Sequence, residues 1–151
     1  PKKYTIDLNK VNYDYIAGKD EMLKAVEDIL AKGQKSNYAI IDSRGFEEIM
    51  GERKLDNAAR GGHMPGAKFI EWKNVTDFEK KLSFQELGKI QKVFEQNGIT
   101  KDKTIYAYCH VGAGRSSHII TALELLGYQN VKVYTGSWDE WANDMNLPIR
   151  R

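Results

Sequence analysis

The chain has 151 residues, of which 41% are hydrophobic, so it is long enough to fold as one globular domain with its own core. Its 23 Lys and Arg and 21 Asp and Glu residues are scattered along the whole length. The sequence therefore contains no cluster of basic residues that would indicate binding to nucleic acid or to a membrane. Because no apolar run approaches the roughly 18 residues needed to span a bilayer, we expect a soluble protein that binds neither nucleic acid nor membrane.

The N-terminal part of the chain contains an irregular arm and the first helix. Residues 1–19 lack clear periodicity and are interpreted as an arm or a lead-in from an upstream segment, and residues 20–151 are expected to form the domain. Asp20 predicts a helix N-cap, because apolar residues at helical spacing follow it, and Gly33 predicts the end of that helix. The run YAIID, residues 38–42, is too short for a helix and predicts a buried strand.

The middle of the chain is less regular. The sequence GFEEIM suggests a short amphipathic piece, residues 51–62 a polar loop, and residues 67–70 a second short strand. In the run LSFQELGKIQKVFEQNG, Ser83 and Glu86 have the spacing of a capping box and Gly98 is a typical C-terminal stop. This run therefore predicts a further helix.

Two strands and two helices are predicted in the last third. TIYAY, residues 104–108, predicts a strand, and a helix should begin at Ser116 or Ser117 and end at Leu126. VKVY, residues 131–134, predicts the next strand, and a short helix is expected around SWDEWAN. Strands that alternate with helices indicate an α/β fold: an open, mainly parallel sheet with helices on both faces.

The only cysteine, Cys109, directly follows the predicted strand at 104–108. Ligand crevices of open α/β sheets form at this carboxyl edge. Five residues, HVGAG, separate Cys109 from Arg115, and their glycines would let the backbone curl with its N–H groups inward, next to a helix N-terminus. Such a loop would hold an anion and favour the thiolate over the thiol. The alternative, a small buried apolar cysteine, explains neither the glycines nor the arginine.

These motifs resemble those of a known family. YCHVGAGRSSHIITALELLGYQNVKVYTGSWDEWAN resembles the active-site half of a rhodanese-family sulfurtransferase, especially the catalytic domain of tandem thiosulfate or 3-mercaptopyruvate enzymes. Upstream, IIDSRGFEEIMG and RGGHMPGAKFIEW resemble the family's Asp-x-Arg and Gly-His-x-Pro-Gly-Ala motifs. The resemblance implies a rhodanese-like fold and an upstream second rhodanese domain as partner, with Pro1 as a cut end.

The resemblance also implies a mechanism. Cys109 would take sulfur from a small-molecule donor (thiosulfate, 3-mercaptopyruvate or polysulfide), become a persulfide, and pass the sulfur to cyanide or a thiol. The loop amides that would hold the persulfide belong to His110, Val111, Gly112, Ala113, Gly114 and Arg115. Because the chain has no second cysteine, the acceptor must come from outside it.

The loop is one residue longer than in most sulfurtransferases of this family. Cys-x5-Arg is the spacing of rhodanese-fold phosphatases and arsenate reductases, in which the counterpart of Arg115 clamps a tetrahedral oxyanion. Phosphate-ester hydrolysis or arsenate reduction is therefore the rival activity, although a phosphatase also needs a general acid, and neither Asp42 nor His110 is obviously placed for that role.

A third alternative is a non-catalytic regulatory module, but such modules usually lack the cysteine. RSSH and GSWDEW favour sulfur transfer.

Two further arginines are candidate substrate contacts. Arg60 could bind an anionic donor at the rim of the site or could be a solvated loop residue. Arg44 could touch substrate or could form a structural ion pair with Asp42.

No spacing of His, Cys, Asp and Glu resembles a metal site, and no glycine motif matches a nucleotide fingerprint, so we expect neither metal nor cofactor. A lone cysteine is compatible with the cytoplasm, and the periplasm stays open if a leader was removed.

Overall fold

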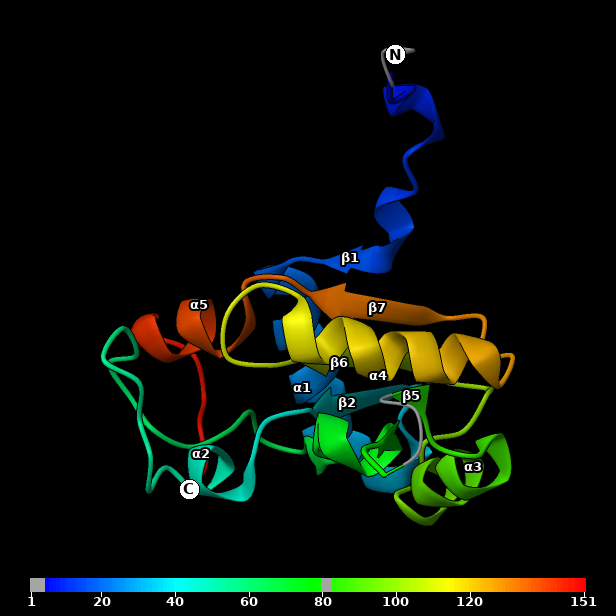
Figure 1. Cartoon of the computed structure of the whole chain (residues 1–151). Coiled ribbons are helices and arrows are strands. Elements are labelled where there is room, and N and C mark those ends of the chain that lie inside the picture. Colours follow the sequence, from blue (N-terminus) through cyan, green and yellow to red (C-terminus); the bar gives the residue numbers. More distant parts are fainter. Residues whose placement is uncertain (1–4, 80–82) are drawn as a thin grey trace.

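A five-stranded parallel sheet forms the centre of the molecule (Figure 1). The computed structural model describes residues 5–79 and 83–151. The strands lie in the order β1-β7-β6-β2-β3, and each neighbouring pair is parallel. Their bounds are Ile16–Ala17 (β1), Tyr38–Asp42 (β2), Lys68–Phe69 (β3), Thr104–Tyr108 (β6) and Val131–Tyr134 (β7). A separate antiparallel pair consists of β4, Thr76–Asp77, and β5, Ser83–Phe84. The predicted α/β fold with a mainly parallel sheet is confirmed.

Helices connect the strands. The α-helices are Lys19–Lys32 (α1), Phe46–Ile49 (α2), Leu87–Gln96 (α3), Gly114–Leu125 (α4) and Ser137–Asn143 (α5). The short 3-10 helices are Leu8–Lys10 (η1), Tyr13–Tyr15 (η2), Gly33–Lys35 (η3) and Trp72–Val75 (η4). None of the helices in the described parts of the chain is long and apolar enough to cross a membrane.

The two faces of the sheet bury separate cores, because successive side chains of a strand point to opposite faces. In β6, Ile105 and Ala107 pack with α3 and α4 on one face. Tyr106 and Tyr108 pack with α1 and α5 on the other face. Both faces of the sheet are therefore covered by helices, as the strand–helix alternation predicts. The loops that connect strands and helices lie at the ends of the strands.

Several predicted helix starts are wrong by a few residues. Helix α1 begins at Lys19 with Gly18 as N-cap, so Asp20 lies inside the first turn, where its charge complements the helix dipole. Ser83 caps no helix: it pairs with Asp77 between β5 and β4, and α3 begins at Leu87. Helix α4 begins at Gly114, before the serines that the sequence favours as its start.

The sheet also contains a strand that the sequence does not predict. Ile16 and Ala17, within the segment interpreted as an arm, pair with Val133 and Tyr134 of β7. The preceding residues, 5–15, are exposed and form only η1 and η2. Two residues of strand are too few to produce a recognisable alternation of apolar and polar side chains.

Candidate active site

The loop that carries Cys109 lies at the carboxyl edge of the sheet, between the end of β6 and the start of α4. After β2 the chain moves to β3 on one side, whereas after β6 it moves to β7 on the other side. Loops that diverge in this way leave a crevice between the two strands. Gly112 turns the loop with a φ of 59°, a left-handed conformation that glycine adopts without strain. The predicted placement of Cys109 on this loop is confirmed.

The sulfur of Cys109 is surrounded by oxygen atoms. Cys109 is 2% exposed. Its Sγ lies 3.6 Å from the carbonyl oxygen of Val111 and 3.7 Å from that of Gly112. The hydroxyl of Ser116 donates to Sγ at 3.7 Å, and the hydroxyl of Ser137 lies 3.8 Å away. The carbonyl contacts suit an S–H donor, and the hydroxyl of Ser116 can stabilise the thiolate once that proton has left.

Ser137 holds the cysteine loop from the neighbouring strand connection. Its Oγ accepts the N–H of Cys109 at 3.2 Å and lies 2.8 Å from the carbonyl oxygen of Gly112 and 2.9 Å from that of Tyr134. Ser137 is fully buried, and within residues 5–79 and 83–151 it is the one non-glycine residue with a positive φ, 53°. A serine in this conformation has a backbone cost that a glycine would not have.

The N-terminus of α5 supports the same loop. The N–H of Trp138 donates to the carbonyl of Cys109 at 3.0 Å, and the N–H of Asp139 donates to the carbonyl of His110 at 2.8 Å. These bonds satisfy donors at the start of the helix, which have no partner within it. The first two loop residues are thus fixed through their backbone.

Arg115 makes a bidentate ion pair with Glu48 of α2. Its two terminal nitrogens lie 2.6 Å and 3.0 Å from the Glu48 carboxylate oxygens, and the two side chains are 29% and 7% exposed. Burial alone would raise the pKa of Glu48, but the hydrogen bonds and charge of Arg115 outweigh it, and the pKa lies below its ordinary value. The pKa of Arg115 is raised, chiefly by its hydrogen bonds to Glu48.

Arg44 is placed in the core. Its guanidinium donates to both carboxylate oxygens of Asp42, donates to the carbonyl of Gly62 at 2.7 Å, and lies over the Trp138 ring, 4.6 Å from its centroid. Arg44 is 1% exposed. Tyr108 donates to the same carboxylate. These contacts support the structural ion pair, one of the two alternatives that the sequence leaves open, and do not bring Arg44 to the cysteine.

Arg60 is also engaged with the backbone. Its guanidinium donates to four carbonyls, at 2.6–3.1 Å, at and beyond the C-terminal end of α5: those of Trp141, Ala142, Asp144 and Leu147. The side chain thereby satisfies carbonyls that have no partner within the helix. With these contacts, Arg60 is neither a solvated loop residue nor an arginine that is free to bind an anion.

The remaining loop residues differ in exposure. His110 is 6% exposed, and its Nε2 lies 2.9 Å from Oδ1 of Asn57, whose amide donates to Asp139. Burial lowers the pKa of His110. Val111 is 57% exposed at the rim, and Ala113 is the N-cap of α4. That the loop amides hold an anion stays a prediction.

Comparison with known proteins decides the family. Residues 23–144 match the model of the rhodanese-like domain, which is more than half of the chain. The chain belongs to the rhodanese family. This match spans both motif regions that the sequence resemblance rests on and the whole of the site described above.

The relatives of this rhodanese domain are sulfur-handling proteins. A sulfur carrier protein from Thermus thermophilus is 37% identical over 88% of the chain and 50% of the relative. A thiosulfate sulfurtransferase from Azotobacter vinelandii is 36% identical over 86% of the chain and 46% of the relative. A putative thiosulfate sulfurtransferase from Haloferax volcanii is 33% identical over 91% of the chain and 50% of the relative. The chain spans about half the length of these curated relatives.

Solved structures agree with the fold. The anaerobic ergothioneine biosynthesis enzyme from Chlorobium limicola, in complex with trimethyl histidine, matches with a TM-score of 0.79 at 25% identity. The match covers 91% of this chain and 32% of the enzyme. A second matched structure, at a TM-score of 0.78 and 25% identity, holds ergothioneine covalently linked to a persulfide cysteine. This match covers 91% of the present chain and 32% of the matched chain.

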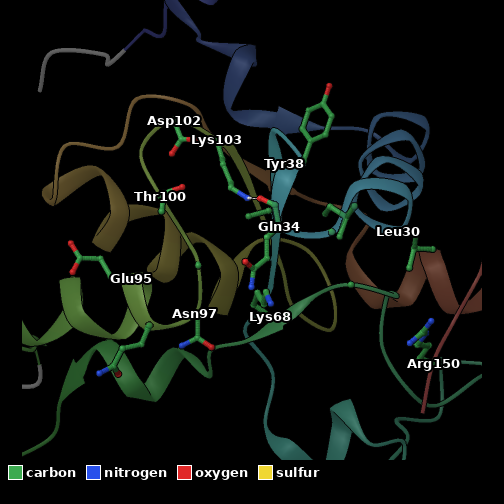
Figure 2. Close-up of a pocket in the computed structure, with 16 residues that line it drawn as sticks. Leu30, Gln34, Tyr38, Lys68, Glu95, Asn97, Thr100, Asp102, Lys103 and Arg150 are labelled. Atoms are coloured by element: carbon green, nitrogen blue, oxygen red, sulfur yellow. Dashed lines mark hydrogen bonds between the residues drawn. The ribbon is translucent and has the colours of Figure 1, made fainter.

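Figure 2 shows the lining of a cavity of about 900 Å³, and no residue of the cysteine loop belongs to that lining. The cavity is bounded by the end of α1, by residues that precede β6 and by the start of β2, including Leu30, Tyr38, Asn97 and Lys103. Its lining thus belongs to the opposite, amino edge of the sheet. No group of three or more metal-ligating side chains occurs in the described part of the rhodanese domain.

Sequence reasoning missed Glu48 and Ser137. Glu48 is the second of two adjacent glutamates, and only the short helix α2 decides that it is buried while Glu47 is exposed. Ser137 had a usable signal: the carboxyl ends of parallel neighbours meet at one edge of a sheet. Polar residues just after β7 must therefore lie beside those just after β6.

Proposed function

We propose that this rhodanese domain is a sulfurtransferase that carries sulfane sulfur as a persulfide on Cys109. The observation that supports it best is the setting of the sulfur, with the hydroxyls of Ser116 and Ser137 at 3.7 Å and 3.8 Å, on a loop braced by α5. The names of the relatives, which include thiosulfate sulfurtransferases and a sulfur carrier, support the same activity.

In the first half-reaction, the thiolate of Cys109 attacks the outer sulfur of a donor such as thiosulfate, 3-mercaptopyruvate or polysulfide. The bond to that sulfur breaks, and its electron pair leaves with the rest of the donor, as sulfite when the donor is thiosulfate. The hydroxyl of Ser116, together with the loop amides that the resemblance implies, would stabilise the negative charge of the resulting persulfide.

In the second half-reaction, an acceptor thiol or cyanide attacks the outer sulfur of the persulfide. The sulfur–sulfur bond breaks and the electron pair returns to Cys109 as the thiolate, so the cycle needs no external oxidant or reductant. Since Cys109 is the only cysteine of the chain, the acceptor is a separate molecule or another part of a longer protein. An upstream rhodanese domain, the partner that the resemblance implies, belongs to the second possibility.

The rival activity on phosphate esters or arsenate rests on the Cys-x5-Arg spacing, which would use Arg115 to clamp two oxygens of the substrate. In this structure both terminal nitrogens of Arg115 bind Glu48 instead. This engagement favours sulfur transfer over phosphate-ester hydrolysis or arsenate reduction, both of which would need Arg115 as the clamp.

The test is to incubate the protein separately with thiosulfate, 3-mercaptopyruvate, polysulfide and an aryl phosphate, and to measure the intact mass and the release of phenol. We expect at least one sulfur donor to add a single sulfur atom that dithiothreitol or cyanide removes. The matched control is Cys109→Ser, which should take up none. Turnover of the aryl phosphate with no sulfur uptake would show that the proposal is wrong.

A further inference from the structure

An ion pair joins the two elements that follow the neighbouring strands β2 and β6, at the edge of the sheet where Cys109 lies. Glu48 comes from α2, which follows β2, and Arg115 comes from the first turn of α4, which follows β6. Two parallel N–H···O bonds, of 2.6 Å and 3.0 Å, join them. The guanidinium is also within electrostatic reach of the cysteine: Glu48 is the main cause of the raised pKa of Arg115, and a thiolate at Cys109 would raise that pKa further.

The carboxylate of Glu48 is committed to this pair. The residue is 6% exposed, and one oxygen also accepts the N–H of Gly45 at the start of α2. A ligand that draws Arg115 toward itself must leave this buried carboxylate without its cation. Breaking a buried pair on one side is costly, because an uncompensated charge remains.

The other two arginines that the sequence offered for anion binding cannot replace Arg115. Arg44 is held by Asp42 in the core, and Arg60 binds four backbone carbonyls. All three guanidinium groups are thus satisfied within the protein.

We propose that Glu48 determines donor specificity: by holding Arg115, it selects against donors that carry two negative charges, such as thiosulfate, and for donors with at most one, such as an alkyl persulfide. This inference rests on the proposed sulfur transfer and narrows its substrate class. With an alkyl persulfide, the thiolate of Cys109 attacks the terminal sulfur of R–S–SH. Cys109–S–SH forms, the donor S–S bond breaks, and R–S⁻ leaves with the electron pair, so the total charge of −1 is unchanged.

One exposed apolar side chain of the cysteine loop fits such a donor. Val111 is 57% exposed on the loop beside the sulfur. An alkyl persulfide can cover this side chain with its carbon atoms, whereas the sulfonate group of thiosulfate would have to give up water there without gaining a cation.

The experiment compares single-turnover loading of Cys109 by thiosulfate and by a freshly generated alkyl persulfide, followed by intact mass. In the wild type, the second-order rate constant should be higher for the alkyl persulfide. In Glu48→Gln, the amide can still accept from Gly45 and Arg115, but the negative charge is gone. The ratio of the persulfide to the thiosulfate rate constant should then fall by roughly tenfold to a hundredfold, the usual effect of one gained charge-assisted hydrogen bond.

Glu47→Gln is the matched control, because Glu47 is the exposed neighbour on the same helix and its replacement removes the same charge. Its donor ratio should stay at the wild-type value. Inorganic phosphate, a second dianion, should inhibit loading of Glu48→Gln more strongly than loading of the wild type or of Glu47→Gln.

Two results would overturn the inference: thiosulfate loading the wild type as fast as the alkyl persulfide, or equal donor ratios in the two glutamine variants. The first result needs no variant, so the inference is testable even if Glu48→Gln does not fold. Failure of every donor to load Cys109 would instead overturn the proposed function, so the two failures are distinct.

Discussion

At the scale of single residues, Ser137 contributes as much to the site as the loop residues themselves. Its one side chain contacts the backbone of Cys109, Gly112 and Tyr134 while its own φ of 53° is unfavourable for any residue except glycine. A buried hydroxyl at this point ties the cysteine loop to the end of β7. We therefore expect it to act as a positioning residue for the sulfur.

Two substitutions of Ser137 distinguish the effect of its hydroxyl from the effect of its backbone strain. Ser137→Ala loses the hydroxyl and keeps the strain, whereas Ser137→Gly loses the hydroxyl and removes the strain. Both variants should load sulfur more slowly, by roughly tenfold, because a buried hydrogen-bonding group is lost. The glycine variant should have the higher melting temperature of the two. Rates and melting curves check this, and wild-type loading rates in both variants would contradict the positioning role.

Glu48 makes stability depend on pH. Its pKa in the folded protein lies below its ordinary value, so the ion pair stabilises the fold above the unfolded-state pKa of about 4.3 and loses this effect as the pH falls through the folded-state pKa. Between pH 7 and about pH 3, urea denaturation should show a larger loss of unfolding free energy for the wild type than for Glu48→Gln. Equal losses in the two proteins would mean that the pair does not stabilise the fold.

The sequence identifies Cys109 and the loop because their signals are local: a strand, two glycines and an arginine within a dozen residues. It cannot identify the partners of Arg115, Arg44 and Arg60 in the same way. Glu48 lies 67 positions from Arg115, and the carbonyls that bind Arg60 lie more than 80 positions away. Only the packing of distant elements decides whether an arginine is free to bind an anion.

At the scale of elements, α5 is held at both ends. Its first N–H groups donate to the carbonyls of Cys109 and His110, and the carbonyls near its last turn accept hydrogen bonds from Arg60. The helix therefore links the loop at residues 51–62 to the cysteine loop. A change at Arg60 should act through this helix and not through a lost contact with the donor.

Arg60→Ala should lower the free energy of unfolding by about 2 kcal/mol, because several buried carbonyls lose their donor. Arg53→Ala, at an exposed arginine in the same loop, is the control and should change stability by less than about 0.5 kcal/mol. Urea denaturation of both variants measures this. If Arg60→Ala were as stable as the control and only weakened donor binding, Arg60 would be a substrate contact after all.

The longer strands were predictable and several helix starts were not, for a physical reason. The strands β2, β6 and β7 are short, mostly apolar and mostly buried, and their bounds match the predicted ones. Capping residues are short polar patterns that also suit turns and strand ends. Ser83 illustrates this, because pairing with β4 takes it into a strand and the helix begins four residues later.

At the scale of the whole molecule, the order of the strands creates the site. With β6 beside β2 and their following connections diverging, the loop between β6 and α4 lies at the same edge of the sheet as helix α2, which follows β2 (Figure 1). The alternation of elements predicts the α/β fold, but the order β1-β7-β6-β2-β3 follows from pairings between distant segments. For this reason the sequence predicts where the nucleophile lies and not which side chains surround its crevice.

We expect sulfur to travel on Cys109. The most direct measurement loads the protein with a sulfane donor, removes the donor, and then divides the sample: one part is digested and mapped by mass, and the other receives cyanide. We expect one extra sulfur per chain on the peptide that contains Cys109, an equal amount of thiocyanate released by cyanide, and neither in Cys109→Ser. A wild-type protein that stays unmodified with every sulfur donor, or that carries the sulfur at another residue, would contradict the account.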